Sequence, residues 1–86
     1  MISAPKQIFD PAVWLDKYGD FLYAYAFSRV RDEAAAEDLV QETLLAAMQT
    51  INKFEAKSAE KTWLCGILKH RIIDYFRKSS REVELT

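Results

Sequence analysis

The sequence predicts an all-α protein that folds as a compact three-helix bundle. Its 86 residues contain only two Gly and two Pro, too few for the many turns of a small β fold. Apolar side chains recur every three or four residues in separate stretches, the spacing of helices that bury one face. Half of the residues are hydrophobic and 29% are charged, so one globular domain is expected.

The first predicted helix covers about residues 11–30 and follows a lead-in of residues 1–10. Asp10 and Pro11 are typical of a helix start, because Asp accepts free amide hydrogens and Pro fits the first helical position. Tyr23 and Phe27 lie on a second side, so this helix is expected to contact two neighbours. The residues expected on its main core face are Trp14, Tyr18, Phe21, Leu22 and Tyr25.

The second predicted helix covers about residues 33–52 and begins where Arg31 and Asp32 interrupt the apolar pattern. Asp32 is expected to cap this helix, and acidic residues in its first half suit the positive end of its dipole. The core face is expected to hold Val40, Leu44, Ala47 and Ile51. The outer face carries Asp38, Gln41, Glu42 and Gln49, with Leu45 among them.

The third predicted helix covers about residues 59–79, after a lysine-bearing connection in which Ser58 is the expected cap. Residues 11–80 would then form the helical domain, and residues 81–86 a tail or the start of a linker, with fraying expected from residue 79. The expected core residues are Leu64, Leu68, Ile72 and Tyr75, flanked by Trp63 and Ile67. The opposite face carries Gly66, Lys69, His70, Ile73 and Arg77.

The net charge of −1 conceals an asymmetry between the two parts of the chain. Residues 1–52 carry four basic and eight acidic side chains, whereas residues 53–86 carry eight basic and five acidic ones. Because phosphates attract clustered Lys and Arg, the C-terminal part is the expected nucleic-acid surface. An acidic N-terminal part is better suited to a protein partner.

Several functional classes are disfavoured by the residues present. A single Cys excludes an internal disulfide, and one Cys with one His makes a zinc site built from this chain alone implausible. No nucleophile–base pair or glycine-rich phosphate loop is evident, so neither an enzyme nor a bound cofactor is expected. No signal peptide or apolar run long enough to span a bilayer is seen, which favours a cytoplasmic protein without membrane insertion.

A set of short motifs along the second and third helices resembles a known family. The motifs are Glu37-Asp38-Leu39-Val40-Gln41-Glu42-Thr43, Phe54, Thr62-Trp63-Leu64, Ile73-Asp74 and Arg77. In this order and spacing they resemble region 2 of bacterial sigma factors, most closely the extracytoplasmic-function (ECF) type. The resemblance covers about residues 11–80. It implies that a second helical domain, which reads the promoter −35 element, lies outside these residues.

The resemblance implies that the second helix binds core RNA polymerase, at the clamp helices of the β′ subunit. The residues matched to that contact are Asp38, Gln41, Glu42 and Leu45. The three polar residues are three and four positions apart and therefore project from one side of a helix. The alternative from periodicity alone is a solvated acidic face with one exposed Leu.

The resemblance also implies that the connection at residues 54–61 and the third helix open and read the promoter −10 element. In this family the connection captures a base flipped out of the non-template strand, and a basic groove with aromatic surface suits that task. His70 stands where the family often has Asn, and it is equally well read as a solvated surface residue. Trp63 is better read as core than as a wedge between bases. The implied DNA-binding residues are Lys53, Lys57, Lys61, Gly66, Lys69, His70 and Arg77.

Two further expectations concern partners. Sigma factors are also held by anti-sigma proteins, so such a protein is a further implied partner. The alternative function is a small helical protein-interaction domain without DNA-binding activity, which predicts no salt-sensitive binding to nucleic acid.

Overall fold

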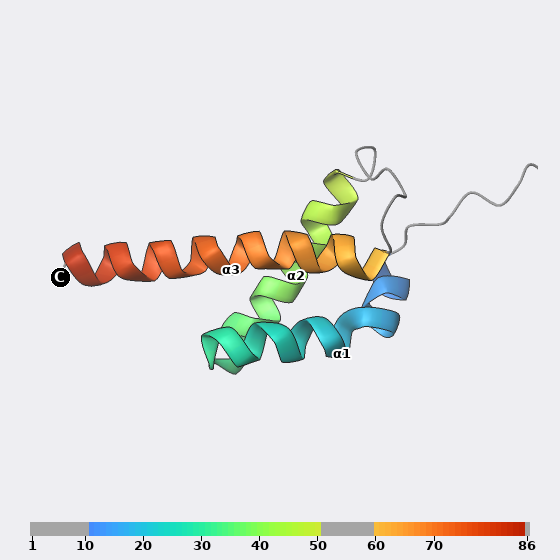
Figure 1. The fold of residues 1–86 in the computed structure, drawn as a ribbon, viewed down its shortest axis with the longest axis horizontal. Coiled ribbons are helices and arrows are strands. Elements are labelled where there is room, and N and C mark those ends of the chain that lie inside the picture. The colour runs from blue at the N-terminus through green and yellow to red at the C-terminus, as the bar shows by residue number, and fades with distance from the viewer. Residues whose placement is uncertain (1–10, 51–59, 86) are drawn as a thin grey trace, which may run out of the picture.

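The computed structural model describes residues 11–50 and 60–85, with side chains described from 12 to 50 and from 60 to 80. These residues form three helices, α1 (Pro11–Val30), α2 (Glu33–Gln49) and α3 (Glu60–Leu85). α1 and α3 run in the same direction, and α2 returns across them (Figure 1). The predicted all-α bundle is therefore confirmed. The predictions for residues 1–10 and 51–59, including Ile51, Lys53, Lys57 and Ser58, lie outside the described residues.

The predicted break between α1 and α2 is confirmed, and its geometry is clear. Arg31 has a positive φ of 57°, and its N–H donates to the carbonyl of Phe27 at 2.8 Å. A left-handed residue with this hydrogen bond is a common helix C-terminus. The carboxylate of Asp32 then accepts a hydrogen bond from the N–H of Ala35 at 3.0 Å, which caps α2 as expected.

The ends of α2 and α3 differ from the sequence-based expectation. α2 ends at Gln49, three residues before its predicted end, and Thr50 forms a turn. α3 continues to Leu85, so the frayed tail predicted from residue 79 onward is wrong for residues 79–85. The physical reason is that those residues contain no Gly or Pro to end a helix. The C-terminal part of α3 projects beyond α1 and α2 (Figure 1).

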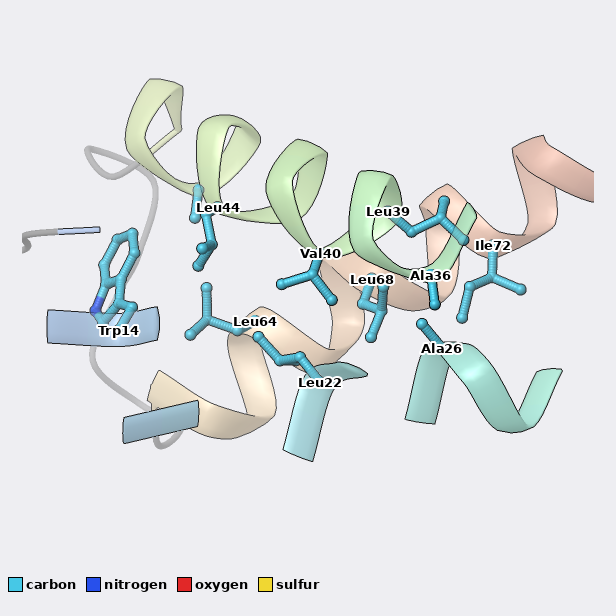
Figure 2. Close-up of a cluster of buried hydrophobic side chains, with 11 residues drawn as sticks. Trp14, Leu22, Ala26, Ala36, Leu39, Val40, Leu44, Leu64, Leu68 and Ile72 are labelled. Carbon is cyan, nitrogen blue, oxygen red and sulfur yellow. The ribbon is translucent and has the colours of Figure 1, made fainter. Parts of the chain in front are cut away.

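The core lies where the three helices face one another (Figure 2). Thr43 is buried among apolar residues and donates its hydroxyl hydrogen to its own helix, at the Leu39 carbonyl, at 2.8 Å. Removing this apolar surface from water is the main source of stability in a domain of this size. The buried cluster consists of Trp14, Leu22, Ala26, Ala36, Leu39, Val40, Leu44, Ala47, Leu64, Leu68 and Ile72.

Most predicted core residues in the described ranges are buried, with corrections in both directions. Phe21 was expected in the core, but 40% of its surface is exposed. Ala36 and Leu39 are buried although they were not predicted in the core. Trp63 packs against the cluster and meets Trp14 edge to face at 5.9 Å between ring centroids, as expected for a core residue.

Candidate nucleic-acid and partner interfaces

The outer face of α2 presents an acidic surface with an apolar residue at one end. Asp38, Gln41 and Glu42 are all exposed, and Leu45 follows one turn later with 59% of its surface exposed. α2 keeps these side chains outward because its opposite side supplies Val40, Leu44 and Ala47 to the core. We call these four exposed residues the α2 outer face. The α2 outer face thus combines three polar side chains with one exposed apolar side chain.

A groove of about 450 Å³ lies between α2 and α3, and its charges are mixed. α2 contributes Asp38 and Glu42, and α3 contributes one acidic and three basic side chains. Arg77, expected to bind DNA, therefore shares this groove with two residues of the α2 outer face. The charged residues of α3 that line it are Arg71, Asp74, Arg77 and Lys78.

A second groove lies between α1 and α3, and we call it the α1–α3 groove. Its first part, of about 470 Å³, is lined by Phe21, Lys61, Thr62, Cys65, Gly66 and Lys69. At Lys69 it adjoins a second part, of about 370 Å³, lined by Tyr25, Arg29, Ile72 and Ile73. Among the described lining residues there are three cations and no acidic side chain. This groove therefore has the charge and aromatic content expected at single-stranded nucleic acid.

Cations and aromatic rings are in contact within the α1–α3 groove. The Lys61 ammonium lies 4.1 Å from the centroid of the Phe21 ring, and the Arg29 guanidinium lies 5.1 Å from that of Tyr25. Both pairs are within the range of cation–π attraction. The contact of Lys61 with Phe21 links α3 to α1, whereas Arg29 and Tyr25 both belong to α1.

The structure brings together only part of the predicted DNA-binding set. Lys61, Gly66 and Lys69 line the α1–α3 groove, whereas Arg77 lies in the other groove. His70 is exposed and lies outside both. Lys53 and Lys57 lie outside the described part of the chain.

Sequence reasoning missed the α1 side of this groove. Phe21, Tyr25 and Arg29 line it, although Phe21 and Tyr25 were expected in the core. Their regular spacing of four residues places them on one face of α1, and that spacing was visible in the sequence. What the sequence did not show is that this face lies at the margin of the core.

The two glycines have different structural surroundings. A Cβ at Gly19 would lie 3.0 Å from Cδ1 of Leu15, whereas a Cβ at Gly66 would meet no described atom within 4 Å. Cys65 is half-buried and lines the α1–α3 groove. The groove therefore has an open floor at Gly66 with a thiol beside it.

A hydrogen bond joins α1 to the first residue of α3. The hydroxyl of Tyr18 donates to Oε1 of Glu60 at 3.0 Å. The pKa of Tyr18 is raised above its ordinary value, first by burial and then by the hydrogen bond to Glu60 and its negative charge. This contact holds the end of α3 that carries Lys61 against α1.

Two features are absent from the described residues. No helix in the described ranges is long and apolar enough to cross a membrane. Within the same ranges, no three His, Cys, Asp or Glu side chains gather in a way that would hold a metal ion.

Comparison with known proteins gives consistent matches. The family model described as sigma-70 region 2 matches residues 14–82. The ECF RNA polymerase sigma factor SigX of Bacillus subtilis is 43% identical over 63 residues, which cover 73% of this chain and 32% of SigX. A probable RNA polymerase sigma factor of Haemophilus influenzae is 44% identical over 62 residues, covering 72% of this chain and 32% of the relative.

A third relative extends the match. The ECF RNA polymerase sigma factor BldN of Streptomyces coelicolor is 36% identical over 72 residues, covering 83% of this chain and 27% of BldN. The chain thus spans about a third or less of the length of these relatives. No solved structure matches the chain at a significant level.

Proposed function

Since this chain belongs to the sigma-70 region 2 family, within its ECF branch, we propose that it is a transcription initiation module. It binds core RNA polymerase through α2 and the promoter −10 element through α3 and the connection before it. The observation that carries this proposal is the separation of an acidic, Leu-bearing α2 outer face from a basic, aromatic α1–α3 groove. We propose that it acts in the cytoplasm and catalyses no reaction of its own.

The α2 outer face is the proposed site for the clamp helices of the polymerase β′ subunit. Carboxylates of Asp38 and Glu42 would meet basic groups there, with Gln41 hydrogen-bonding between them. Leu45 supplies the apolar surface that becomes buried when the partner docks. Opposite charges across such a contact accelerate association and select the partner.

The polymerase contact is tested by reversing the charge of the face. Asp38→Lys with Glu42→Lys is expected to weaken binding of a β′ clamp-helix fragment at least tenfold, measured by titration calorimetry. Each close charge pair lost in a protein interface typically costs about 1.5 kcal/mol or more, roughly a factor of ten. The matched control is Asp16→Lys with Asp20→Lys, which makes the same charge change on exposed positions of α1.

Equal binding by both double variants contradicts the polymerase proposal.

A second pair of variants tests the apolar contact separately from the charges. Leu45→Ala is expected to weaken the complex, whereas Leu15→Ala, at a site 54% exposed on α1, is not. Neither Leu contributes to the core, so both variants remain folded.

The α1–α3 groove and the connection before α3 are the proposed site for the non-template strand of the −10 element. Lys61 and Lys69 supply cations for its phosphates, and Gly66 leaves room for close approach. His70, Arg77, Lys53 and Lys57 complete the proposed DNA-binding set. Contacts of this kind bind backbone strongly and read bases more weakly.

The DNA contact is tested with single strands of selected sequence. A pool with a randomised window is enriched on the immobilised protein, and the enriched oligonucleotide is then compared with its scrambled version by fluorescence anisotropy. We expect a preference for the enriched sequence and a steep loss of affinity with salt. Absence of any preference, together with unchanged binding by Lys69→Ala, would contradict base recognition.

A second candidate function is a helical protein-interaction domain without a DNA role. The observation that favours it is the mixed-charge groove between α2 and α3, which suits a partner helix bearing both charges. An anti-sigma protein is one partner of this kind, and it is compatible with either function. The oligonucleotide experiment separates the two, because a pure interaction domain shows no salt-sensitive DNA binding.

A further inference from the structure

The α2 outer face and the α1–α3 groove are opposite in charge. α2 carries four acidic side chains and no basic one along Glu33–Gln49. The described residues that line the α1–α3 groove include Lys61, Lys69 and Arg29 but no acidic side chain. Two copies of this chain repel each other little, because each has a net charge of only −1. The acidic surface of one copy is therefore attracted to the basic surface of another.

The two surfaces also match in apolar content and in shape. Leu45 projects from α2 beside the carboxylates of Asp38 and Glu42 and is largely exposed. The α1–α3 groove is hollow and exposes apolar side chains, Phe21 in its first part and Ile73 in its second. A helix that lays its apolar side chain into an apolar groove is a common mode of helix binding. α2 presents the projecting surface, and the groove presents the hollow one.

The floor of the groove leaves room for a second helix. A Cβ at Gly66 would meet no described atom within 4 Å, and the distance between packed helices decreases with smaller side chains at their contact. Lys61 and Lys69 are eight residues apart on α3, about 12 Å at the helical rise. Asp38 and Leu45 are seven residues apart on α2, about 10.5 Å. The two stretches are therefore similar in length.

We propose that the α2 outer face of one molecule docks into the α1–α3 groove of a second copy of this chain. Leu45 packs against Phe21, above Gly66. The carboxylates of Asp38 and Glu42 pair with the cations that line the groove. This inference concerns the free chain and goes beyond the proposed function, because the second copy covers both of the surfaces that the proposed function assigns to other partners.

The contact is heterologous, since it joins two different surfaces. Each dimer leaves one α2 outer face and one α1–α3 groove free, so association continues head to tail unless a ring closes. Salt screens attraction between exposed charges. The average mass is therefore expected to grow with chain concentration at low salt.

Sedimentation equilibrium of the purified chain over a concentration series is the first experiment. We expect the weight-average mass to rise with concentration in dilute buffer and to return to that of one chain at high salt. The mass of one chain at every concentration overturns the inference. Association that high salt strengthens indicates an apolar contact between like surfaces and also overturns it.

Reversing the charge of one surface at a time identifies the two surfaces in contact. Asp38→Lys with Glu42→Lys makes both surfaces basic, and Lys61→Glu with Lys69→Glu makes both acidic. Each double variant alone is expected to associate at least about tenfold more weakly, because its charge pairs are lost. An equimolar mixture of the two is expected to regain association, since each surface then meets one of opposite charge. A mixture that stays monomeric overturns the inference.

Matched controls make the same charge changes elsewhere. Asp16→Lys with Asp20→Lys alters exposed positions of α1, and Arg71→Glu with Lys78→Glu alters the groove between α2 and α3. Neither control is expected to weaken self-association. Weakening by a control equal to that by its matched variant shows an effect of net charge alone and overturns the inference.

A cross-link between copies locates the contact. Cys65, the only cysteine of the chain, lines the α1–α3 groove. With Gln41→Cys on the α2 outer face, mild oxidation is expected to join the introduced thiol of one copy to Cys65 of another, seen as a covalent dimer and identified by peptide mapping. Ser80→Cys, at an exposed position of α3 outside the groove, is the control. Equal rates of linkage to Cys65 in the two variants overturn the inference.

The inference and the proposed function fail separately. Gly66→Leu is expected to fill the groove and weaken self-association about fivefold or more, the usual effect of an over-large side chain in a packed contact, with the circular dichroism of a helical bundle retained. Unchanged self-association in this variant overturns the inference. A chain that is monomeric under all conditions but binds the β′ clamp-helix fragment overturns only the inference. A chain that self-associates as described but does not bind that fragment supports the inference and contradicts the polymerase proposal.

Discussion

At two positions of this protein, the backbone conformation favours a residue type other than the one present. The reasons differ between the two positions. Arg31 adopts a positive φ at the end of α1, a conformation that side chains with a Cβ rarely take. Gly66 lies inside α3, where Ala would be more favourable. The strain at Arg31 ends a helix, whereas the glycine leaves open space in a groove.

Arg31→Gly is expected to raise the free energy of unfolding by about 1 kcal/mol, because glycine adopts the left-handed conformation without steric cost. The measurement is urea denaturation followed by circular dichroism. The matched control is Ala24→Gly at an exposed position within α1, which should lower the free energy of unfolding by about 0.5–1 kcal/mol. A lower stability of Arg31→Gly would show that its side chain has a role at this turn.

Gly66→Ala is expected to raise the free energy of unfolding by about 1 kcal/mol, since the added methyl group improves helix propensity and meets no described neighbour. Gly19→Ala is the control, because its Cβ would lie 3.0 Å from Leu15 and cancel part of the gain. The measurement is again urea denaturation. A destabilised Gly66→Ala would mean that internal packing, and not a ligand, requires the glycine.

At the scale of whole elements, α3 lies between two grooves that differ in charge. The candidate binding residues of α3 are divided between these grooves. α2 lies on one side of α3 with its carboxylates, and α1 lies on the other with aromatic rings and Arg29. The hydrogen bond from Tyr18 to Glu60 ties α1 to the first residue of α3. α1 therefore both completes the core and holds the first residue of α3 in place.

Tyr18→Phe is expected to lower the free energy of unfolding by about 0.5–1.5 kcal/mol at pH 7, the usual net contribution of one hydrogen bond. Since the pKa of Tyr18 in the folded protein is raised above its ordinary 10.0, this contribution is complete below pH 10 and is lost as pH rises through the folded-state pKa. Denaturation of both proteins between pH 7 and 11 measures the difference. Glu60→Gln, which keeps an acceptor oxygen without the charge, should show a weaker pH dependence.

Two results would contradict the prediction for Tyr18. If the stability difference between the unaltered chain and Tyr18→Phe stays constant through pH 11, the hydroxyl is not held in the folded state by Glu60. Equal stability of the two proteins at pH 7 would show that solvent replaces this bond without cost.

At the scale of the whole molecule, one small core holds together the helices that form the two grooves. Leu64 and Leu68 are fully buried at the centre of the cluster, and α1 and α2 both pack against it. A chain of this length is only marginally stable, so any loss from this core affects every site at once.

Leu68→Ala is expected to lower the free energy of unfolding by about 2–5 kcal/mol, because it removes a buried side chain and leaves a cavity. The control is Leu45→Ala, at an exposed position, which should change stability by about 0.5 kcal/mol or less. Comparing the two by urea denaturation tests whether the apolar residues of this chain divide into core and interface as described. A similar loss in both variants would contradict that division.

Periodicity and capping signals predicted most of the fold. Asp32 marked the start of α2, and the apolar spacing predicted Leu64, Leu68 and Ile72 in the core, because these preferences act between residues close in the chain. The end of α3 was missed, since nothing in residues 79–86 breaks a helix and their polarity was read as disorder. Leu39 was missed because its burial depends on how α2 meets its neighbours.

The candidate site was predicted less completely, because it depends on how the helices pack against one another. Helical spacing placed Gly66 and Lys69 on one face of α3, and the family resemblance added Lys61 from the connection before the helix. The sequence alone could not show that Phe21 leaves the core to line their groove or that Arg77 joins Asp38 and Glu42 in the other.

The sequence by itself thus determined the helices, the buried face of each and the separation of acidic from basic parts, all of which depend on neighbours within a turn or two. Only the tertiary structure decided which side chains from different helices share a groove. That outcome depends on the angles and offsets at which helices pack, and these are set by contacts between residues far apart in the chain.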